Sequence, residues 1–250
     1  MDYDKSDIAT HYDEARALTP EGLRQWSELI STSIDAAAVS LVVDLGCGTG
    51  RFSELLAAHL GALVIGIDPS QKMIGHARRK RAAGSVLFQR AAAEGLPLAD
   101  GCVDLVFMSQ AYHHVTDAPA VARECRRVLR EGGYVCIRNT TREDDFAYRH
   151  FFPAMQPLIE SELPSRQHIE RTFMSAGFAV SVHQIVTQVV APDWLTFVGK
   201  SALRADSFLA RLPTHEFDAG MSGLRARAAK ARPEDSVTEE IDWFMFTRSA

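Results

Sequence analysis

The chain has 250 residues, 46% of them hydrophobic, and its formal net charge at pH 7 is −5. This length favours one domain with elaborations, and it can bury a full core without disulfides or a metal ion. The slightly acidic balance argues against a nucleic-acid-binding protein, which usually carries a basic face. The basic run at 78–81 falls at the expected end of a helix, where it compensates the helix dipole.

The cysteines and the first residues of the chain bear on its cellular compartment. The cysteines are Cys47, Cys102, Cys125 and Cys136. They form no CxxC pair and have no metal-ligand spacing, so we expect buried thiols in a reducing compartment and no metal site. Residues 1–15 are charged and lack an apolar core, which argues against a secretory signal. With no apolar run long enough to span a bilayer, we expect a soluble cytoplasmic protein without a membrane partner.

Between about 40 and 140, short apolar runs alternate with helical patterns. The expected strands are 41–45, 62–68, 86–89, 103–109 and 134–139. The expected helices are 51–60, 70–80 and 118–129, and Gly132 and Gly133 are expected to end the third of them. Continuously apolar strands that alternate with helices predict a parallel sheet covered on both faces.

Beyond residue 140 the alternation loosens. A segment rich in aromatic residues and proline occupies 143–164, and a helix is expected at about 165–176. A strand follows at 178–190, then a mostly helical insertion at 192–236 and a last strand at 241–249. The two late strands could pair antiparallel at the edge of the sheet.

The glycine-rich stretch VVDLGCGTG, at 42–50, ends the first expected strand and opens a helix. In open α/β sheets, ligands bind at this edge, beside the first strand. The G-x-G-x-G pattern differs from the G-x-G-x-x-G of dinucleotide-binding folds, because Arg51 stands where the third glycine would be. A phosphate-binding loop is also excluded, since no Gly-Lys-Ser/Thr follows. The pattern therefore favours a nucleoside ligand without a pyrophosphate.

Asp68 ends the second expected strand, in VIGIDPS. A carboxylate there can accept hydrogen bonds from both hydroxyls of a ribose. The alternative is an N-cap for the helix that begins near Pro69, since aspartate caps helices well and proline suits the first helical position. Both roles stay open from the residues alone.

Four motifs in order resemble those of class I S-adenosylmethionine-dependent methyltransferases: VVDLGCGTG, IDPSQKMI, AAAEGLPLADGCVDLVFMSQAYHHV and LREGGYV. The similarity is greatest to the small-molecule group that includes ubiquinone and menaquinone biosynthesis methyltransferases. It implies an α/β fold with a Rossmann-like sheet, mostly parallel with an antiparallel last strand, helices on both faces and a helical lid. The implied single domain, 1–250, comprises an N-terminal helical cover (1–38), a cofactor-binding core (39–140), substrate-side elaborations (141–164 and 192–236) and segments that complete the sheet (165–191 and 237–250).

The resemblance implies S-adenosylmethionine as the cofactor. The glycine loop would lie against its methionine part, Asp68 would bind the ribose, and Met73 would pack on the adenine unless it is ordinary core. Ala92 departs from the family, which often has an aspartate there that contacts the adenine amino group. The implied cofactor residues are Tyr12, Arg16, Asp44, Gly46, Cys47, Gly48, Asp68, Pro69, Met73, Ala92, Ala93, Glu94, Ser109 and Gln110.

The resemblance also implies transfer of a methyl group to a small molecule. His113 and His114 are candidate bases, with loop scaffolding as the alternative, and His11 and His150 are weaker candidates. Aromatic residues could form an apolar lid that suits an apolar or aromatic acceptor, or they could be the core of the insertion: those at 146–152, Trp194, Phe197, Phe208 and Phe217. The competing functions are RNA or protein methylation and non-catalytic cofactor binding.

Overall fold

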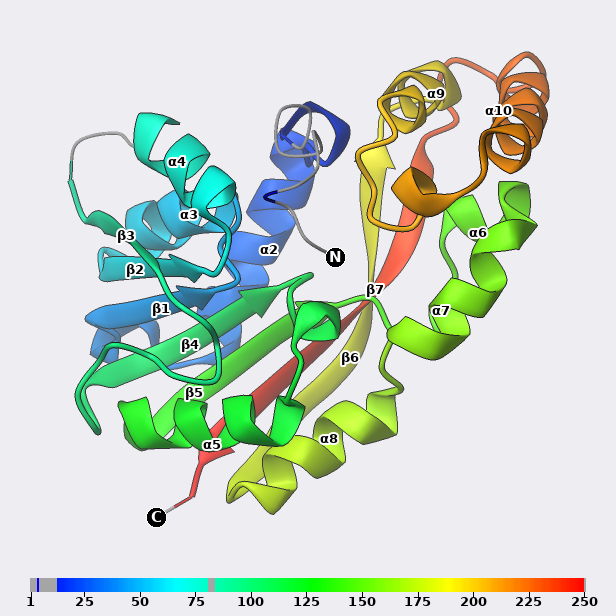
Figure 1. The fold of residues 1–250 in the computed structure, drawn as a ribbon. Helices are drawn as coiled ribbons and strands as arrows, with labels where there is room; N and C mark the ends of the chain where they lie inside the picture. Colours follow the sequence, from blue (N-terminus) through cyan, green and yellow to red (C-terminus); the bar gives the residue numbers. More distant parts are fainter. Residues whose placement is uncertain (1–3, 5–12, 81–83, 250) are drawn as a thin grey trace.

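The computed structural model describes Asp4 and residues 13–80 and 84–249, which are built around one seven-stranded sheet (Figure 1). The strand order is β3-β2-β1-β4-β5-β7-β6. The strands are β1 (Leu41–Leu45), β2 (Leu63–Asp68), β3 (Val86–Arg90), β4 (Val103–Ser109), β5 (Leu129–Asn139), β6 (Phe178–Ala191) and β7 (Val237–Arg248).

The pairing of the strands is mostly parallel. β1 pairs in parallel with β2 and β4, β2 with β3, and β4 with β5. β7 is antiparallel to both of its neighbours, β5 and β6. The predicted sheet, parallel except for its last strand, is therefore confirmed. The strand order reverses between β1 and β4, and this reversal places the ligand-binding crevice of an open α/β sheet at their carboxyl ends.

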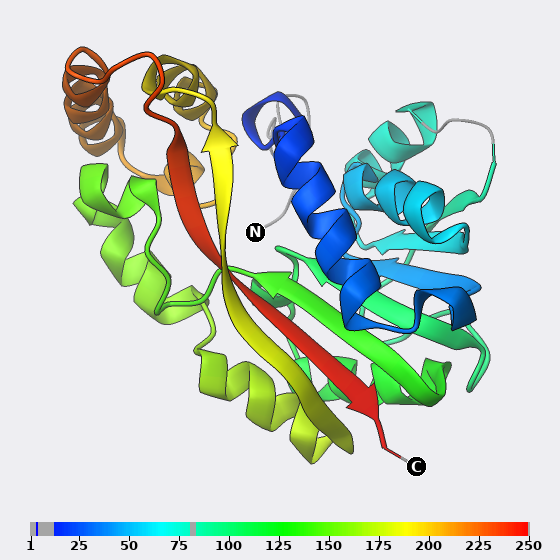
Figure 2. The same cartoon turned by 180° about the vertical axis from the view of Figure 1, so that it is seen from behind.

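Helices cover both faces of the sheet (Figures 1 and 2). The covering helices are α2 (Pro20–Ser33), α3 (Arg51–Leu60) and α4 (Gln71–Lys80) on one face, and α5 (Ala118–Val128) and α8 (Arg166–Ser175) on the other. Val42 packs in the first of these layers and its neighbour Val43 in the second, and both are fully buried. Successive residues of a strand point to opposite faces, so a strand covered on both sides is apolar throughout.

A second group of helices, which we call the cap, occupies 146–163 and 194–228. These helices are α6 (Ala147–Phe151), α7 (Gln156–Glu162), α9 (Trp194–Ala202) and α10 (Thr214–Ala228). The ends of β6 and β7 extend past the other strands to reach the cap (Figure 2). Within the ranges that the structure describes, no helix has the length and apolar character needed to cross a membrane.

The cap has its own apolar core. Phe152 stacks on Phe217 and Tyr148 stacks on Phe197, with ring centroids 5.9 Å and 5.0 Å apart. Burying aromatic rings against one another contributes both apolar area and favourable ring–ring contacts. Most of the aromatic residues considered for a lid therefore hold the cap together.

Two expectations about individual residues are wrong. Gly132 and Gly133 do not end a helix, because α5 stops at Val128 and β5 already begins at Leu129. The glycines lie inside β5, where the register with β4 shifts between Val103 and Leu105, as in a β-bulge. The other three cysteines are buried as expected, but Cys102 is exposed, because it lies in the loop before β4.

Candidate functional site

A cleft with a volume of about 280 Å³ lies at the carboxyl ends of β1, β2 and β4; we call it the main cleft. It brings together most of the residues that the resemblance assigns to the cofactor: Gly46, Gly48, Asp68, Pro69, Met73, Ala92, Ala93, Glu94, Ser109 and Gln110. Its wall also contains the candidate base His114 and residues that the sequence analysis did not single out: Leu45, Met108, Ala111, Val115 and Thr116. These additional residues lie close to predicted site residues in the chain. Their position at or after the end of a strand could therefore have identified them from the sequence.

Gly46 and Gly48 shape the loop after β1. Gly46 has a φ of +75°, and a Cβ built on it would lie 2.3 Å from the Cβ of Ala111. Gly48 has a φ of +54°, but a Cβ there would meet nothing within 4 Å. Both positions need the left-handed backbone that glycine adopts without steric cost. Gly46 allows close packing against the loop after β4, whereas Gly48 leaves bare main chain at the cleft.

We expect Gly46→Ala to lower the free energy of unfolding by about 3 kcal/mol, since it adds a steric clash to the cost of the left-handed backbone. Gly61→Ala is the matched control, because Gly61 has a φ of +65° and open space around its missing Cβ. We expect the control to cost only about 1 kcal/mol. Urea unfolding measures both variants, and equal losses would contradict the clash at Ala111.

The carboxylate of Asp68 connects the end of β2 to the glycine loop. Its Oδ2 accepts a hydrogen bond from the backbone N–H of Gly48 at 2.9 Å, and its Oδ1 accepts one from that of Ser70 at 2.8 Å. Burial raises the pKa of Asp68, and these two hydrogen bonds act in the opposite direction. Each carboxylate oxygen can accept a further hydrogen bond, so Asp68 can also bind hydroxyl groups in the cleft.

Asp68 is not the N-cap that was considered as the alternative, because α4 begins only at Gln71. Ser70 takes that place, and its Oγ accepts a hydrogen bond from the backbone N–H of Met73 at 3.2 Å. Asp4 supports the same helix start by accepting hydrogen bonds from the Ser70 hydroxyl at 2.6 Å and the Lys72 N–H at 3.0 Å. A carboxylate at a helix N-terminus also complements the helix dipole.

Asp44 and Cys47 line a smaller cavity beside the glycine loop, together with Gly46, Gly48, Thr49, Arg51, Phe52 and Ser109. The Ser53 hydroxyl donates to Asp44 Oδ2 at 2.6 Å. Burial and, to a lesser extent, the nearby charge of Asp68 raise the pKa of Asp44 to about 7, against the effects of Ser53 and Arg51. A cationic group beside Asp44 would hold this carboxylate in its charged form.

Met73 and the loop at 92–94 form another part of the wall of the main cleft. Met73 is buried, with 2% of its surface exposed, and it lines the cleft. Glu94 Oε1 accepts a long hydrogen bond of 3.4 Å from the backbone N–H of Asp117. Ala92 contributes no polar side chain at the position where the family often has an aspartate.

Gln110, just after β4, has a strained backbone, with a φ of +53° that residues other than glycine seldom adopt. Its side chain is fixed to the end of β5: Nε2 donates to Thr140 Oγ1 at 2.7 Å, and Oε1 accepts from the Thr140 N–H at 3.0 Å. Such strain persists only where the surroundings hold it, and it is concentrated at functional sites.

A second cavity lies between the sheet edge and the cap; we call it the cap cavity. It shares Gln110 and His114 with the main cleft, and its wall also contains His113 and Arg16. Arg16 Nη1 lies 3.2 Å from Asp206 Oδ2 and so ties the N-terminal segment to the cap. The remaining wall consists of Thr140, Phe146, Tyr148, Leu163, Ala205, Asp206, Ser207, Phe208 and Glu239. Tyr12 and His11 lie outside the described residues.

His113 and His114 stand side by side at the wall of the cap cavity, with ring centroids 4.0 Å apart. His113 Nδ1 is 3.2 Å from Asn139 Oδ1. Burial lowers the pKa of His113 to about 4, and burial followed by the charge of His113 lowers the pKa of His114. Both rings are therefore neutral at pH 7. His150 pairs with Asp145 at the surface and lines neither cavity.

We expect the stability of the wild type, relative to that of the variant His113→Asn, to fall as the pH decreases from about 6.5 toward 4. The folded state keeps His113 neutral until about pH 4, whereas the unfolded chain binds a proton near pH 6.5, so unfolding takes up protons between these values. Urea unfolding at pH 7 and pH 5 measures the loss. His113→Asn removes this titration, and an unchanged pH dependence in that variant would contradict the assignment.

A comparison of the sequence with known families matches residues 43–137 to a methyltransferase domain. These residues run from β1 to β5 and include the glycine loop, Asp68 and Gln110. The matching domain and the sheet topology define the chain as an α/β protein of the class I methyltransferase type.

Two curated relatives illustrate the similarity. The chain is 37% identical over 103 residues to a ubiquinone biosynthesis O-methyltransferase of Rhizobium johnstonii. The aligned segment covers 40% of this chain and 41% of that protein. It is 28% identical over 186 residues to a demethylmenaquinone methyltransferase of Lactobacillus johnsonii, and this alignment covers 68% of this chain and 76% of that protein. This chain therefore matches less than half the length of the Rhizobium protein.

Among solved structures, the Haemonchus contortus phosphoethanolamine N-methyltransferase 2 shares the fold, with a TM-score of 0.64 over 97% of this chain and 57% of that chain. The sequence identity is 18%, so this likeness concerns the fold alone. The matched methyltransferase domain and these relatives support a class I S-adenosylmethionine-dependent methyltransferase that resembles the quinone biosynthesis enzymes.

Proposed function

We propose that the protein transfers a methyl group from S-adenosylmethionine to a small molecule. The observation that carries this proposal is the main cleft, where bare backbone at Gly48 and the carboxylate of Asp68 face one cavity at the carboxyl ends of β1 and β2. This combination suits an adenosyl group, because the main chain can approach the ligand and the carboxylate can accept from its sugar hydroxyls. The sequence match of residues 43–137 to a methyltransferase domain supports the same function.

The residues of the two neighbouring cavities fit the parts of this cofactor. Asp68 would bind the ribose, and Met73 with the backbone of Ala92 and Ala93 would hold the adenine. Asp44 would face the amino group of the methionine part, whose positive charge would keep this buried carboxylate ionised. The proposed cofactor would thus extend from the main cleft past the glycine loop into the smaller cavity beside it.

The cap cavity is the proposed site of the methyl acceptor, because it shares Gln110 and His114 with the main cleft. When bound, S-adenosylmethionine would supply a methyl group that its positively charged sulfur activates for attack by the acceptor, and the sulfur would keep the electron pair of the carbon–sulfur bond. The protein's contribution would be to align the acceptor and to exclude water, and orientation can lower a barrier by about 7–11 kcal/mol. Where the acceptor carries an acidic proton, His113 or His114 is the proposed base, although their low pKa values favour a positioning role.

The wall of the cap cavity mixes rings with polar groups, so we propose a small acceptor with an aromatic or apolar part beside Phe146, Tyr148 and Phe208. Methylation of RNA or protein is the competing function, and the net charge of −5 does not favour it. A cytoplasmic location also remains a prediction.

Calorimetry with S-adenosylmethionine and S-adenosylhomocysteine tests the cofactor, and a screen of metabolite extracts for transfer of labelled methyl tests the reaction. We expect both ligands to bind and one or more small molecules to become labelled. Binding without any labelled product would favour a non-catalytic cofactor-binding protein. Failure of both ligands to bind would refute the proposal.

We expect Ala92→Asp to tighten the binding of S-adenosylhomocysteine about tenfold. The new carboxylate would reach the adenine amino group from the cleft wall, and one such hydrogen bond contributes about 1–2 kcal/mol. Calorimetry measures the change, with Ala92→Asn as the control for a neutral side chain of the same shape. Weaker binding of the aspartate variant would place the adenine elsewhere.

A further inference from the structure

Another cavity adjoins the cap cavity and has four cations in its wall; we call it the cationic cavity. Its charged wall consists of Arg16, Arg51, Arg138 and Lys200, with Glu239 as the single carboxylate among the described residues. The uncharged part of the wall consists of Ala15, Ala17, Leu18, Tyr148, Gln188, Val190 and Phe197. Its volume is about 30 Å³, which suits a group of a few atoms.

The cations come from separate parts of the fold. Arg51 begins α3, Arg138 lies in β5 and Lys200 belongs to α9 of the cap. Arg138 is buried, with 2% of its surface exposed, and donates to Gln188 Oε1 at 2.5 Å and to Ser109 Oγ at 3.2 Å. Folding thus gathers these positive charges around one cavity, although bringing like charges together is unfavourable by itself.

Lys200 shows this repulsion most clearly. Its Nζ donates to the backbone oxygens of Ala17 and Val190, both at 2.6 Å, which leaves one of the three N–H donors of the ammonium. Burial lowers the pKa of Lys200, and the charges of Arg16 and Arg51 lower it further. Glu239 acts against them but also accepts a hydrogen bond from Gln188 Nε2 at 2.7 Å. A bound anion would stabilise this arrangement.

The cationic cavity is more closely connected to the cap cavity than to the cofactor side. It shares Arg16, Tyr148 and Glu239 with the cap cavity, but only Arg51 with the small cavity beside the glycine loop. Burial raises the pKa of Tyr148, so its hydroxyl stays a hydrogen-bond donor between the two cavities. An acceptor that fills the cap cavity can therefore place one end among the cations.

We propose that the methyl acceptor carries a carboxylate, held in the cationic cavity by Arg138 and Lys200, while its accepting atom points toward Gln110 and His114. This inference rests on the proposed function and adds the chemical class of the acceptor. The carboxylate of the cofactor's own methionine part is the competing occupant, and it would reach the cavity past Arg51.

The test uses protein saturated with S-adenosylhomocysteine, titrated with three carboxylates of different size: acetate, sarcosine and benzoate. Each is compared with its primary amide, which has nearly the same shape without the negative charge. We expect one or more of the carboxylates to bind at least tenfold more tightly than its amide. Equal binding of every pair would overturn the inference, whereas absence of S-adenosylhomocysteine binding would refute the proposed function itself.

Two variants locate the anion. We expect Lys200→Gln to weaken carboxylate binding about tenfold with S-adenosylhomocysteine affinity unchanged, and Glu239→Gln to strengthen it, because an opposing charge is removed. Lys230→Gln is the control, since it removes the same charge from an exposed position just after α10. If Lys200→Gln instead weakens the binding of S-adenosylhomocysteine, the cavity binds the cofactor and the inference is wrong. Circular dichroism verifies the fold of each variant, and Glu239→Gln provides an independent result of opposite sign.

Discussion

We expect Asp68→Asn to weaken the binding of S-adenosylhomocysteine about a hundredfold. The substitution keeps the shape of the side chain but removes its negative charge, and two hydrogen bonds to the sugar hydroxyls would lose their ionic partner. Hydrogen bonds to charged groups contribute about 1.5–3 kcal/mol each, so a loss of about 3 kcal/mol, or two orders of magnitude in affinity, is expected. Calorimetry measures it directly.

The structure adds a second reason for a large effect. Both oxygens of Asp68 accept backbone hydrogen bonds, one from the N–H of Gly48 and one from the N–H of Ser70. In asparagine, the NH2 group replaces one of these oxygens, so it would face a backbone N–H that it cannot accept from. The glycine loop would therefore lose one of its supporting hydrogen bonds, and the sugar would lose its acceptor. Asp35→Asn, at an exposed position before β1, is the control and should bind normally. Normal binding by Asp68→Asn would exclude the sugar contact.

The second large effect concerns stability. We expect Arg166→Met to lower the free energy of unfolding by about 3–5 kcal/mol, because it leaves two buried carboxylates without their cation. Arg166, at the start of α8, lies 2.6 Å from Asp144 and 2.9 Å from Asp242, and both aspartate side chains are fully buried. Urea unfolding at pH 7 measures the loss.

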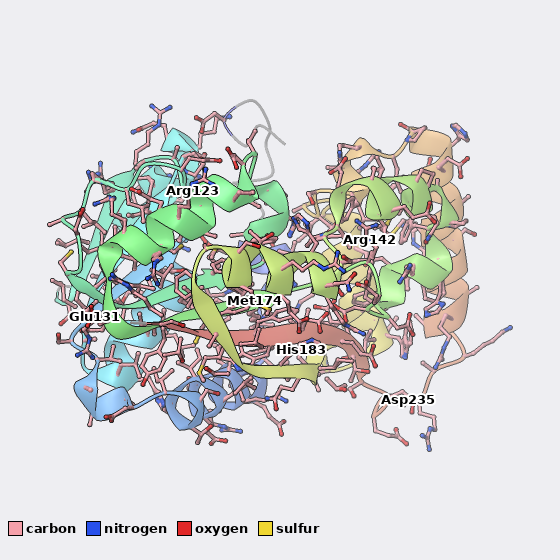
Figure 3. All side chains as sticks on the ribbon, turned by 90° about the horizontal axis from the view of Figure 1, so that it is seen from below. Arg123, Glu131, Arg142, Met174, His183 and Asp235 are labelled. Atoms are coloured by element: carbon pink, nitrogen blue, oxygen red, sulfur yellow. The ribbon has the colours of Figure 1, made fainter. Side chains whose placement is uncertain are left out.

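The surroundings of Asp242 explain why this loss is large. Asp242 also accepts hydrogen bonds from the Thr141 hydroxyl and from His183 Nε2, each at 2.6 Å. His183 lies against Phe244, with the two rings parallel and their centroids 4.3 Å apart, on the side of the sheet that Figure 3 shows. Asp242 is therefore the centre of a network that joins α8, β6, β7 and the loop after β5, and Arg166 is the arginine that pairs with it.

The pH dependence of this variant provides a further check. Burial raises the pKa of Asp144 to about 7 even beside Arg166, and removing Arg166 would raise it more. The folded variant would then bind more protons than the unfolded chain. The difference in the free energy of unfolding between the wild type and the variant should therefore shrink as the pH falls from 7 toward 5. Arg232→Met is the control, because Arg232 is exposed and its pair with the half-buried Asp235 should contribute less than about 1 kcal/mol. A comparable loss in both variants would contradict the network.

The core of the fold could be predicted because its signals are local. Each strand of the core is a short apolar run whose successive residues, such as Val42 and Val43, meet opposite helical layers. Asp68 and the glycines stand at strand ends, and parallel strands bring their carboxyl ends to one edge. The main cleft therefore assembles from residues that the motifs already single out.

The cap and the cationic cavity could not be predicted in the same way, because their contacts join distant segments. Nothing near Lys200 in the sequence indicates that it will meet Arg138, which lies in another part of the chain. The glycine pair in β5 misled for a related reason: a β-bulge and a helix end both favour glycine, and only the pairing with β4 distinguishes them. Local patterns predict elements, whereas the packing of the cap depends on which elements meet.

β6 and β7 run without interruption from the sheet into the cap, paired along almost their whole length. A flexible linker would let the cap rotate freely, but a two-stranded ribbon resists shear because every sliding step breaks a row of backbone hydrogen bonds. The paired strands β6 and β7, rather than the conformation of a loop, thus set the distance between the sheet edge and the cap.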